Sequence, residues 1–136
     1  MLVRFGVVVT ILLIIIFGLN ALEDKNVHRI INAGQLKSVK VWSDVSGYEE
    51  KTVSAEMAED IIFWFNNAKD VRMNEDLAGV TPKSGIIIKV ENEEDIQILR
   101  TGEDFEINRT NMNGKRISYW AKEKHLKEML DQLAGE

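Results

Sequence analysis

Residues 85–120 read GIIIKVENEEDIQILRTGEDFEINRTNMNGKRISYW, and this stretch decides the fold. Gly85–Val90 is a short apolar run of the kind that forms a buried strand. In Ile96–Ile98 and Phe105–Ile107, apolar and polar residues alternate with the period of two that turns one face of a strand toward a core. Asn113-Gly114 is a strong signal for a two-residue hairpin. The stretch therefore predicts an antiparallel meander that ends in the strand Arg116–Trp120.

Ahead of the meander, the sequence predicts a strand, a helix and a short second strand. In Leu36–Trp42 the two valines share one face and Trp42 lies on the other. Ser54 is placed as a helix N-cap, and Lys69–Met73 is expected to be the short strand. The residues after Ser54 form an apolar stripe at the spacing of a core-facing helix: Met57, Ala58, Ile61, Ile62, Phe65 and Ala68.

A second helix is expected to close the domain. Its apolar stripe is Leu126, Met129, Leu130 and Leu133, and Gly135 lies just past its end. The order of elements is thus strand, helix, strands and helix. This order predicts an α+β fold, in which an antiparallel sheet of four to six strands carries two helices packed on one face. An N-terminal transmembrane helix is expected to precede the domain.

We expect residues 1–22 to be a transmembrane signal anchor. Residues 5–22 are an uncharged run of 18 residues with one clearly polar member, Asn20. As a helix they would span about 27 Å, close to the hydrocarbon core of about 30 Å. The alternative is a cleaved secretory signal. That reading needs small residues before the cut, and Leu19–Ala21 supplies them poorly.

The flanking charges predict which side of the membrane the domain occupies. Arg4 favours a cytoplasmic N-terminus, and the acids Glu23 and Asp24 tolerate translocation. We therefore expect a single-pass cell-membrane protein with an extracytoplasmic domain over residues 35–136. The lipid bilayer is its first expected partner, through residues 5–22. The chain has no Cys, which excludes both a diacylglyceryl anchor and a disulfide.

Residues 23–34 are predicted to be a juxtamembrane helix that continues the anchor, and a flexible stalk is the alternative. The apolar residues Leu22, Val27, Ile30 and Ile31 recur at roughly helical spacing. Gly34 lies where a left-handed helix cap would be. His28 belongs to this segment, and we expect it to be exposed and without a special function.

Composition and motifs narrow the function classes. The net charge is −5, and an acidic surface argues against nucleic acid and against adhesion to an anionic bilayer. His125 is expected in solvent on the polar side of the last helix. The acidic turn Glu91–Asp95 lacks the ligand spacing of a calcium loop, and without Cys there is no thiol nucleophile. We therefore predict no catalytic residues, no metal site and no cofactor.

Three aromatic residues fall outside the predicted core face, and they are candidates for binding. Trp42 opposes the valine face of its strand, Tyr48 lies in the turn that follows, and Trp120 ends the last strand. Exposed aromatics often anchor partners. Trp42 and Tyr48 are our predicted partner-binding residues, with a protein at the membrane as the expected partner. The alternative is that a helix or loop covers them.

The order of these elements resembles that of a known class of domain. The meander GIIIKV, IQIL, FEI and ISYW, followed by Leu126, Met129 and Leu130, resembles small extracytoplasmic domains of Gram-positive bacteria of the YhfM-like kind. The resemblance covers roughly residues 36–134. It implies a location outside the cytoplasm, on a lipid anchor or a single membrane helix, and implies little about activity. This chain lacks the anchor Cys of the lipoproteins.

Two function classes follow from the sequence. The first is a non-enzymatic interaction or sensory domain held at the outer face of the membrane. The second is a small cell-envelope hydrolase or an accessory subunit of an envelope enzyme. The second class needs a cleft with convergent polar groups, and the long aperiodic loop Asn74–Ser84 is the segment that hints at one.

Overall fold

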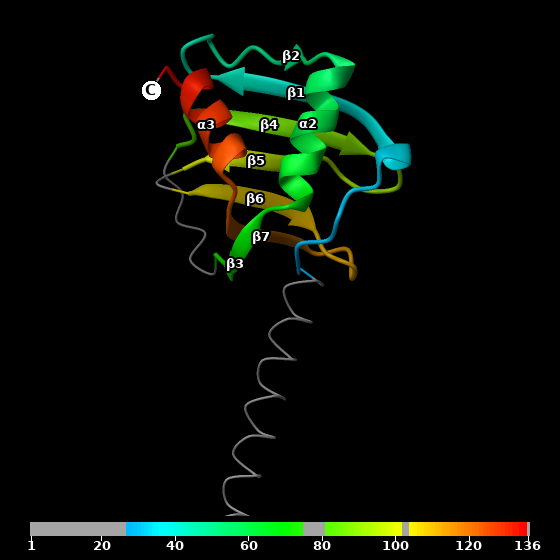
Figure 1. The fold of residues 1–136 in the computed structure, drawn as a ribbon. Coiled ribbons are helices and arrows are strands. Elements are labelled where there is room, and N and C mark those ends of the chain that lie inside the picture. The colour runs from blue at the N-terminus through cyan, green and yellow to red at the C-terminus, as the bar shows by residue number, and fades with distance from the viewer. Residues whose placement is uncertain (1–26, 75–80, 102–103, 136) are drawn as a thin grey trace, which may run out of the picture.

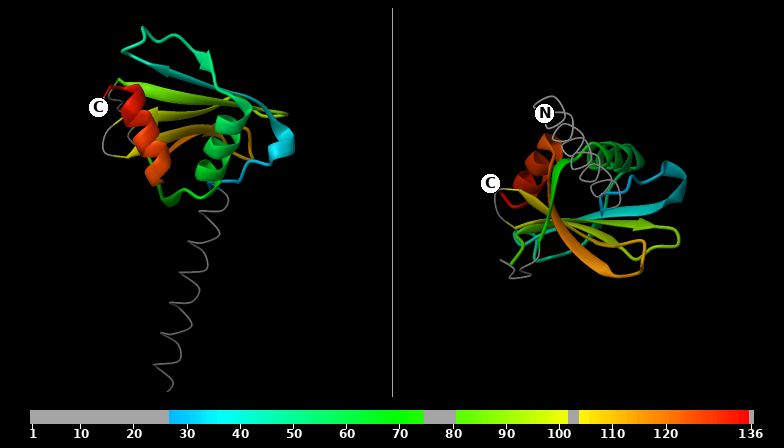
Figure 2. Two further views of the ribbon diagram at one scale, coloured as in Figure 1. Left: turned by 45° about the horizontal axis from the view of Figure 1, so that its top comes forward. Right: turned by 90° about the horizontal axis from the view of Figure 1, so that it is seen from below.

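The computed structural model describes residues 27–74, 81–101 and 104–135. Within these residues, seven strands form one antiparallel sheet, and the two helices lie side by side on one of its faces (Figures 1 and 2). The strand order is β2-β1-β4-β5-β6-β7-β3. The elements are β1 (Leu36–Ser43), β2 (Lys51–Thr52), α2 (Ala55–Asn66), β3 (Lys69–Met73), β4 (Ser84–Val90), β5 (Ile96–Arg100), β6 (Phe105–Thr110), β7 (Arg116–Lys122) and α3 (Lys124–Leu133). The predicted α+β class is confirmed.

The predicted meander is confirmed as β4 to β7. Its register aligns Ile86, Ile98, Ile107 and Tyr119 as successive cross-strand partners, and all four side chains are fully buried. Phe65 of α2 and the leucines Leu126 and Leu130 of α3 are also fully buried in the same core. The core therefore lies between the helices and one face of the sheet. The alternating apolar residues of the strands and the apolar stripes of the helices predicted this position.

The sheet has one strand more than the upper limit of the expected four to six. The additional strand is β2, whose two residues pair with Lys40 and Val41 of β1. A pair of residues is too short to produce an alternating pattern, so the sequence could not show it. The strand Lys69–Met73 is present, and it pairs with β7 at the far edge of the sheet.

Helix α2 begins and ends through side-chain hydrogen bonds. The Ser54 hydroxyl accepts from the backbone N–H of Met57 at 3.2 Å, which confirms the predicted N-cap. At the other end, the side chain of Asn66 donates to the Ile31 carbonyl at 3.0 Å and accepts from the Ile31 N–H at 2.8 Å. The end of α2 is thereby joined to the chain that leads into β1.

The predicted juxtamembrane helix is wrong for residues 28–32. Of residues 27–32, Val27 alone is helical, and a short 3₁₀ helix, η1 (Ala33–Gln35), follows. Because Asn66 pairs with both backbone groups of Ile31, this stretch runs non-helically and buries the Ile31 side chain. The packed unit therefore starts before the expected boundary at residue 35.

The predicted membrane anchor, residues 1–22, lies outside the described residues. Neither described helix has the length and apolar character needed to cross a bilayer.

Candidate functional site

Trp42 lies on the sheet face away from the helices, where the sequence placed it. Its strand neighbour Val39 is almost fully buried on the opposite, core side. Trp42 is paired across the sheet with Gly85 of β4, and its indole covers that glycine closely. A residue without a side chain is what lets the ring lie over the neighbouring strand.

Tyr48 stands beside Trp42 in the turn after β1. The two ring centroids are 5.8 Å apart, and Tyr48 is 56% exposed. Its backbone is in the left-handed region at φ 63°, directly after Gly47 at φ 70°. This conformation costs a bulky residue of order 1 kcal/mol. The Tyr48 N–H donates to the Ser43 carbonyl at 2.8 Å, which holds the turn closed. The turn therefore presents an aromatic ring outward at a cost in backbone energy.

Further half-buried apolar side chains continue this surface across the sheet. Leu99 follows Gly85 in the cross-strand register, and Trp120 lies two strands further along the same row. Ile87 occupies the next row on the same face. We call Trp42, Tyr48, Ile87, Leu99 and Trp120 the open sheet face. Neither described helix covers it (Figure 2).

One carboxylate on this face, that of Glu106, is bonded within the sheet. Glu106, between Leu99 and Trp120 in the row, accepts hydrogen bonds from the Ser118 hydroxyl and from the Asn74 amide. These bonds occupy its carboxylate within the sheet. Polar groups that already have hydrogen-bond partners within the protein keep those bonds when a binding partner removes the surrounding water.

A second set of interactions lies at the end of the domain where the described chain begins. The Nε2 atom of His28 is 2.7 Å from the Phe65 carbonyl, and its Nδ1 is 2.7 Å from the Tyr119 hydroxyl. Because a carbonyl can only accept, Nε2 carries the hydrogen and Tyr119 donates to Nδ1. Burial lowers the pKa of His28, and burial likewise raises the pKa of Tyr119. The expectation of an exposed His28 is wrong, because its ring joins α2 to β7.

Arg109 is the buried charge of this end of the domain. It is 2% exposed, and its guanidinium pairs with Glu93 at 2.6 Å and donates to the Arg29 carbonyl at 2.5 Å. Its Cζ lies 5.8 Å from the centroid of the Phe65 ring. The sequence assigned Arg109 no role. The available signal was the alternation along β6, which places it on the core side after Phe105 and Ile107.

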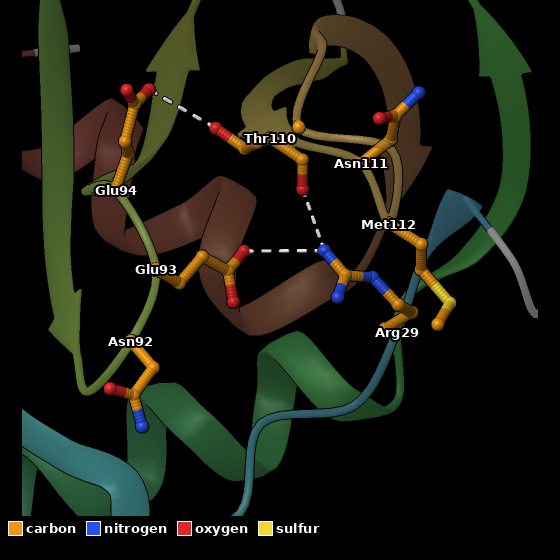
Figure 3. A pocket seen from close by; sticks show the side chains of 8 residues that line it. Arg29, Asn92, Glu93, Glu94, Thr110, Asn111 and Met112 are labelled. Atoms are coloured by element: carbon orange, nitrogen blue, oxygen red, sulfur yellow. Dashed lines mark hydrogen bonds and ion pairs between the residues drawn. The ribbon is translucent and has the colours of Figure 1, made fainter.

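A cleft of about 450 Å³ opens beside this pair (Figure 3). In it, Arg29 donates to the Thr110 carbonyl at 2.6 Å and lies 3.4 Å from Glu93. Glu94 accepts from the Thr110 hydroxyl at 3.1 Å. The lining residues are Arg29, Asn92, Glu93, Glu94, Thr110, Asn111, Met112 and Gly114. The charged groups of the cleft thus hold its walls together.

The remaining candidates for chemistry have structural roles. His125 is exposed as predicted, stacks on the Trp64 ring at 5.1 Å and contacts Glu123 at 2.9 Å. The predicted acidic turn Glu91–Asp95 is confirmed, although the inward orientation of Glu93 was not foreseen. Among the described residues, no group of three or more acidic or histidine side chains could hold a metal ion.

Comparison with known proteins finds no match to a family model, to a curated protein or to a solved structure.

Proposed function

We propose that this chain is a non-enzymatic, membrane-anchored interaction or sensory domain. Residues 5–22 hold it in the membrane, residues 27–135 lie outside the cytoplasm, and the open sheet face binds a protein partner. The observation that carries this proposal is the exposed ring of Tyr48, held in a left-handed backbone against Trp42. Residues held in sparsely populated backbone regions cluster at functional sites.

The composition of the open sheet face supports the same proposal. Binding energy at protein interfaces concentrates in a few aromatic side chains surrounded by contacts that exclude water. Trp42 and Tyr48 provide such a pair at one end of the face, and Ile87 and Leu99 extend it with half-buried apolar surface. Glu106 lies within it, already bonded to Ser118. A partner that covers this face would therefore leave the hydrogen bonds of the Glu106 carboxylate in place.

The alternative is a small envelope hydrolase or an accessory subunit of an envelope enzyme. Such a site needs carboxylates that are free to exchange protons or to hold a nucleophile. In the described cleft, Glu93 pairs with Arg109, and Glu94 contacts Thr110 and Arg116. These pairings favour the interaction class. Residues 75–80 of the loop that hinted at an enzyme lie outside the described residues.

The test is crosslinking and pull-down of the full chain from membranes. Tyr48→Gly removes the ring and relieves the left-handed backbone, so the domain stays folded while recovery of the partner falls several-fold. Phe63→Ala is the matched control, because Phe63 is similarly exposed at 66% but lies on α2. Loss of the partner with Phe63→Ala and retention with Tyr48→Gly would place recognition on the helices and reject the open sheet face.

The location is tested separately. Protease added to spheroplasts should digest the domain without disruption of the cells, because residues 27–135 are proposed to lie outside. Digestion that requires disrupted cells would reverse the orientation. The intact mass of the membrane-extracted protein should match a chain that retains residues 1–22. A mass that matches a chain beginning near Leu22 would show a cleaved signal.

A further inference from the structure

Two exposed apolar side chains, Ile30 and Met112, lie at the end of the domain where the described chain begins. Met112 is in the turn between β6 and β7 and lines the same cleft as Arg29 (Figure 3). Ile30 lies between Arg29, which is bonded to the end of β6, and Ile31, which is bonded to the end of α2. We call Ile30 and Met112, with Lys115 of the same turn as Met112, the basal surface.

The basal surface is the part of the domain that the anchor would hold nearest to the bilayer. Val27 is the fifth residue after Leu22, and five extended residues reach about 18 Å at most. The polar zone on each side of the hydrocarbon core is about 5–8 Å deep. Figure 1 shows residues 27–31 and the β6–β7 turn at the same end of the domain as β7 and β3. A chain anchored through residues 5–22 therefore keeps this end close to the headgroups.

The chemistry of the basal surface fits the interface of a bilayer. Apolar side chains with cationic neighbours bury the apolar part at headgroup depth and place the charge near lipid phosphate. Two acids of the adjacent turn are paired, Glu93 with Arg109 and Glu94 with Arg116. The net negative charge of the chain opposes adhesion of a free domain. A short tether gives a high effective concentration, so even a weak contact is populated.

We propose that the basal surface rests on the outer leaflet and inserts Ile30 and Met112 among the lipid headgroups. This inference rests on the proposed anchoring through residues 5–22. It sets the orientation of the domain, because the sheet then stands on its β7–β3 edge with β2 furthest from the membrane (Figure 1). The open sheet face is directed sideways, toward a partner that is held at the same height above the bilayer.

The absence of Cys allows a clean test with single labels on the full chain. Met112→Cys and Val45→Cys each receive a fluorophore, and the proteins are reconstituted in phosphatidylethanolamine–phosphatidylglycerol vesicles. Val45 is the matched control, because it is 72% exposed against 74% for Met112 and lies after β1, away from the basal surface. Quenching by an aqueous ion should be several-fold weaker at position 112 than at position 45. Ile30→Ser should increase quenching at position 112.

Equal quenching at the two positions, in protein that floats with the vesicles, would overturn the basal contact and leave the anchor intact. Failure of the full chain to float with vesicles would instead remove the anchor, and with it the proposed function. The two failures are therefore distinguished by flotation.

Discussion

The indole of Trp42 fills the space in which a side chain at Gly85 would stand, since a Cβ at Gly85 would lie 2.5 Å from Cε2 of Trp42. The glycine and the tryptophan are therefore a matched pair across β1 and β4. A glycine inside a strand weakens it by about 0.5–1 kcal/mol relative to Ala. In return for this loss of stability, the ring of Trp42 can pack over Gly85 on the open sheet face.

Gly85→Ala should destabilise the domain by about 1–3 kcal/mol, because the indole must move away. In a Trp42→Ala background, the same substitution should be neutral or should stabilise by about 0.5–1 kcal/mol. Urea titration of the four proteins completes a double-mutant cycle. Additive effects within about 0.5 kcal/mol would show that the two residues do not exclude one another.

Glu93→Ala should cost about 3–5 kcal/mol, because it leaves the Arg109 guanidinium buried without its counter-charge. Glu94→Ala is the matched control from the same turn. The side chain of Glu94 is 72% exposed, so its loss should change stability by no more than about 0.5 kcal/mol. Thermal and urea unfolding measure both, and similar values for the two variants would contradict a buried role for Glu93.

Stability should fall as the medium becomes acidic, through His28. Burial lowers the pKa of His28 below its ordinary value of 6.5, so the folded domain holds the ring neutral. As the pH falls, the unfolded chain takes up the proton before the folded domain does. The contribution of neutral His28 to the free energy of unfolding is therefore complete above pH 6.5 and declines as the pH falls below that value. After burial, the hydrogen bond to the Phe65 carbonyl favours the charged ring, and the Arg109 charge on β6 opposes it.

The other neighbours of His28 are the Phe65 carbonyl from α2 and the Tyr119 hydroxyl from β7. His28→Gln retains hydrogen-bonding capacity and removes the titration. Urea titrations across the acidic range should show a smaller loss of stability in this variant than in the natural chain. Parallel pH profiles would exclude His28 as the titrating group.

A chain that begins at residue 35 should be less stable than one that begins at residue 27, by about 2–5 kcal/mol. The shorter chain lacks the buried side chain of Ile31 and both hydrogen bonds between Ile31 and Asn66. Ile31→Ala in the longer chain should reproduce a large part of this loss. Equal unfolding midpoints for the two chains would support the original boundary between residues 34 and 35.

Local patterns predicted most of the fold. The alternation in Phe105–Ile107 and the Ser54 cap depend on neighbours within a few residues, and both are confirmed. The conformation of Ile31 was missed because its partner, Asn66, is 35 residues away. Helical spacing alone could not reveal that a side chain would pair with its backbone.

The same distinction applies to the candidate sites. The period of two was sufficient to place Trp42 off the core, but it gave no sign that Gly85 would lie beneath the ring. The bond between His28 and Tyr119 joins residues 91 positions apart, so no local pattern could have predicted it. The exposure of Met112 likewise depends on the way the β6–β7 turn projects from the finished sheet.

The attachment of residues 28–31 has a mechanical consequence. His28 is bonded to α2 and β7, Arg29 to the end of β6, and Ile31 to the end of α2. Tension on the chain ahead of Val27 is therefore shared among both layers of the domain, and several bonds must break together before β1 is pulled. Forced unfolding depends on the height of that barrier more than on equilibrium stability. Residues 28–31 thus prevent a pulling force on the N-terminal side of the chain from reaching Trp42 and Tyr48.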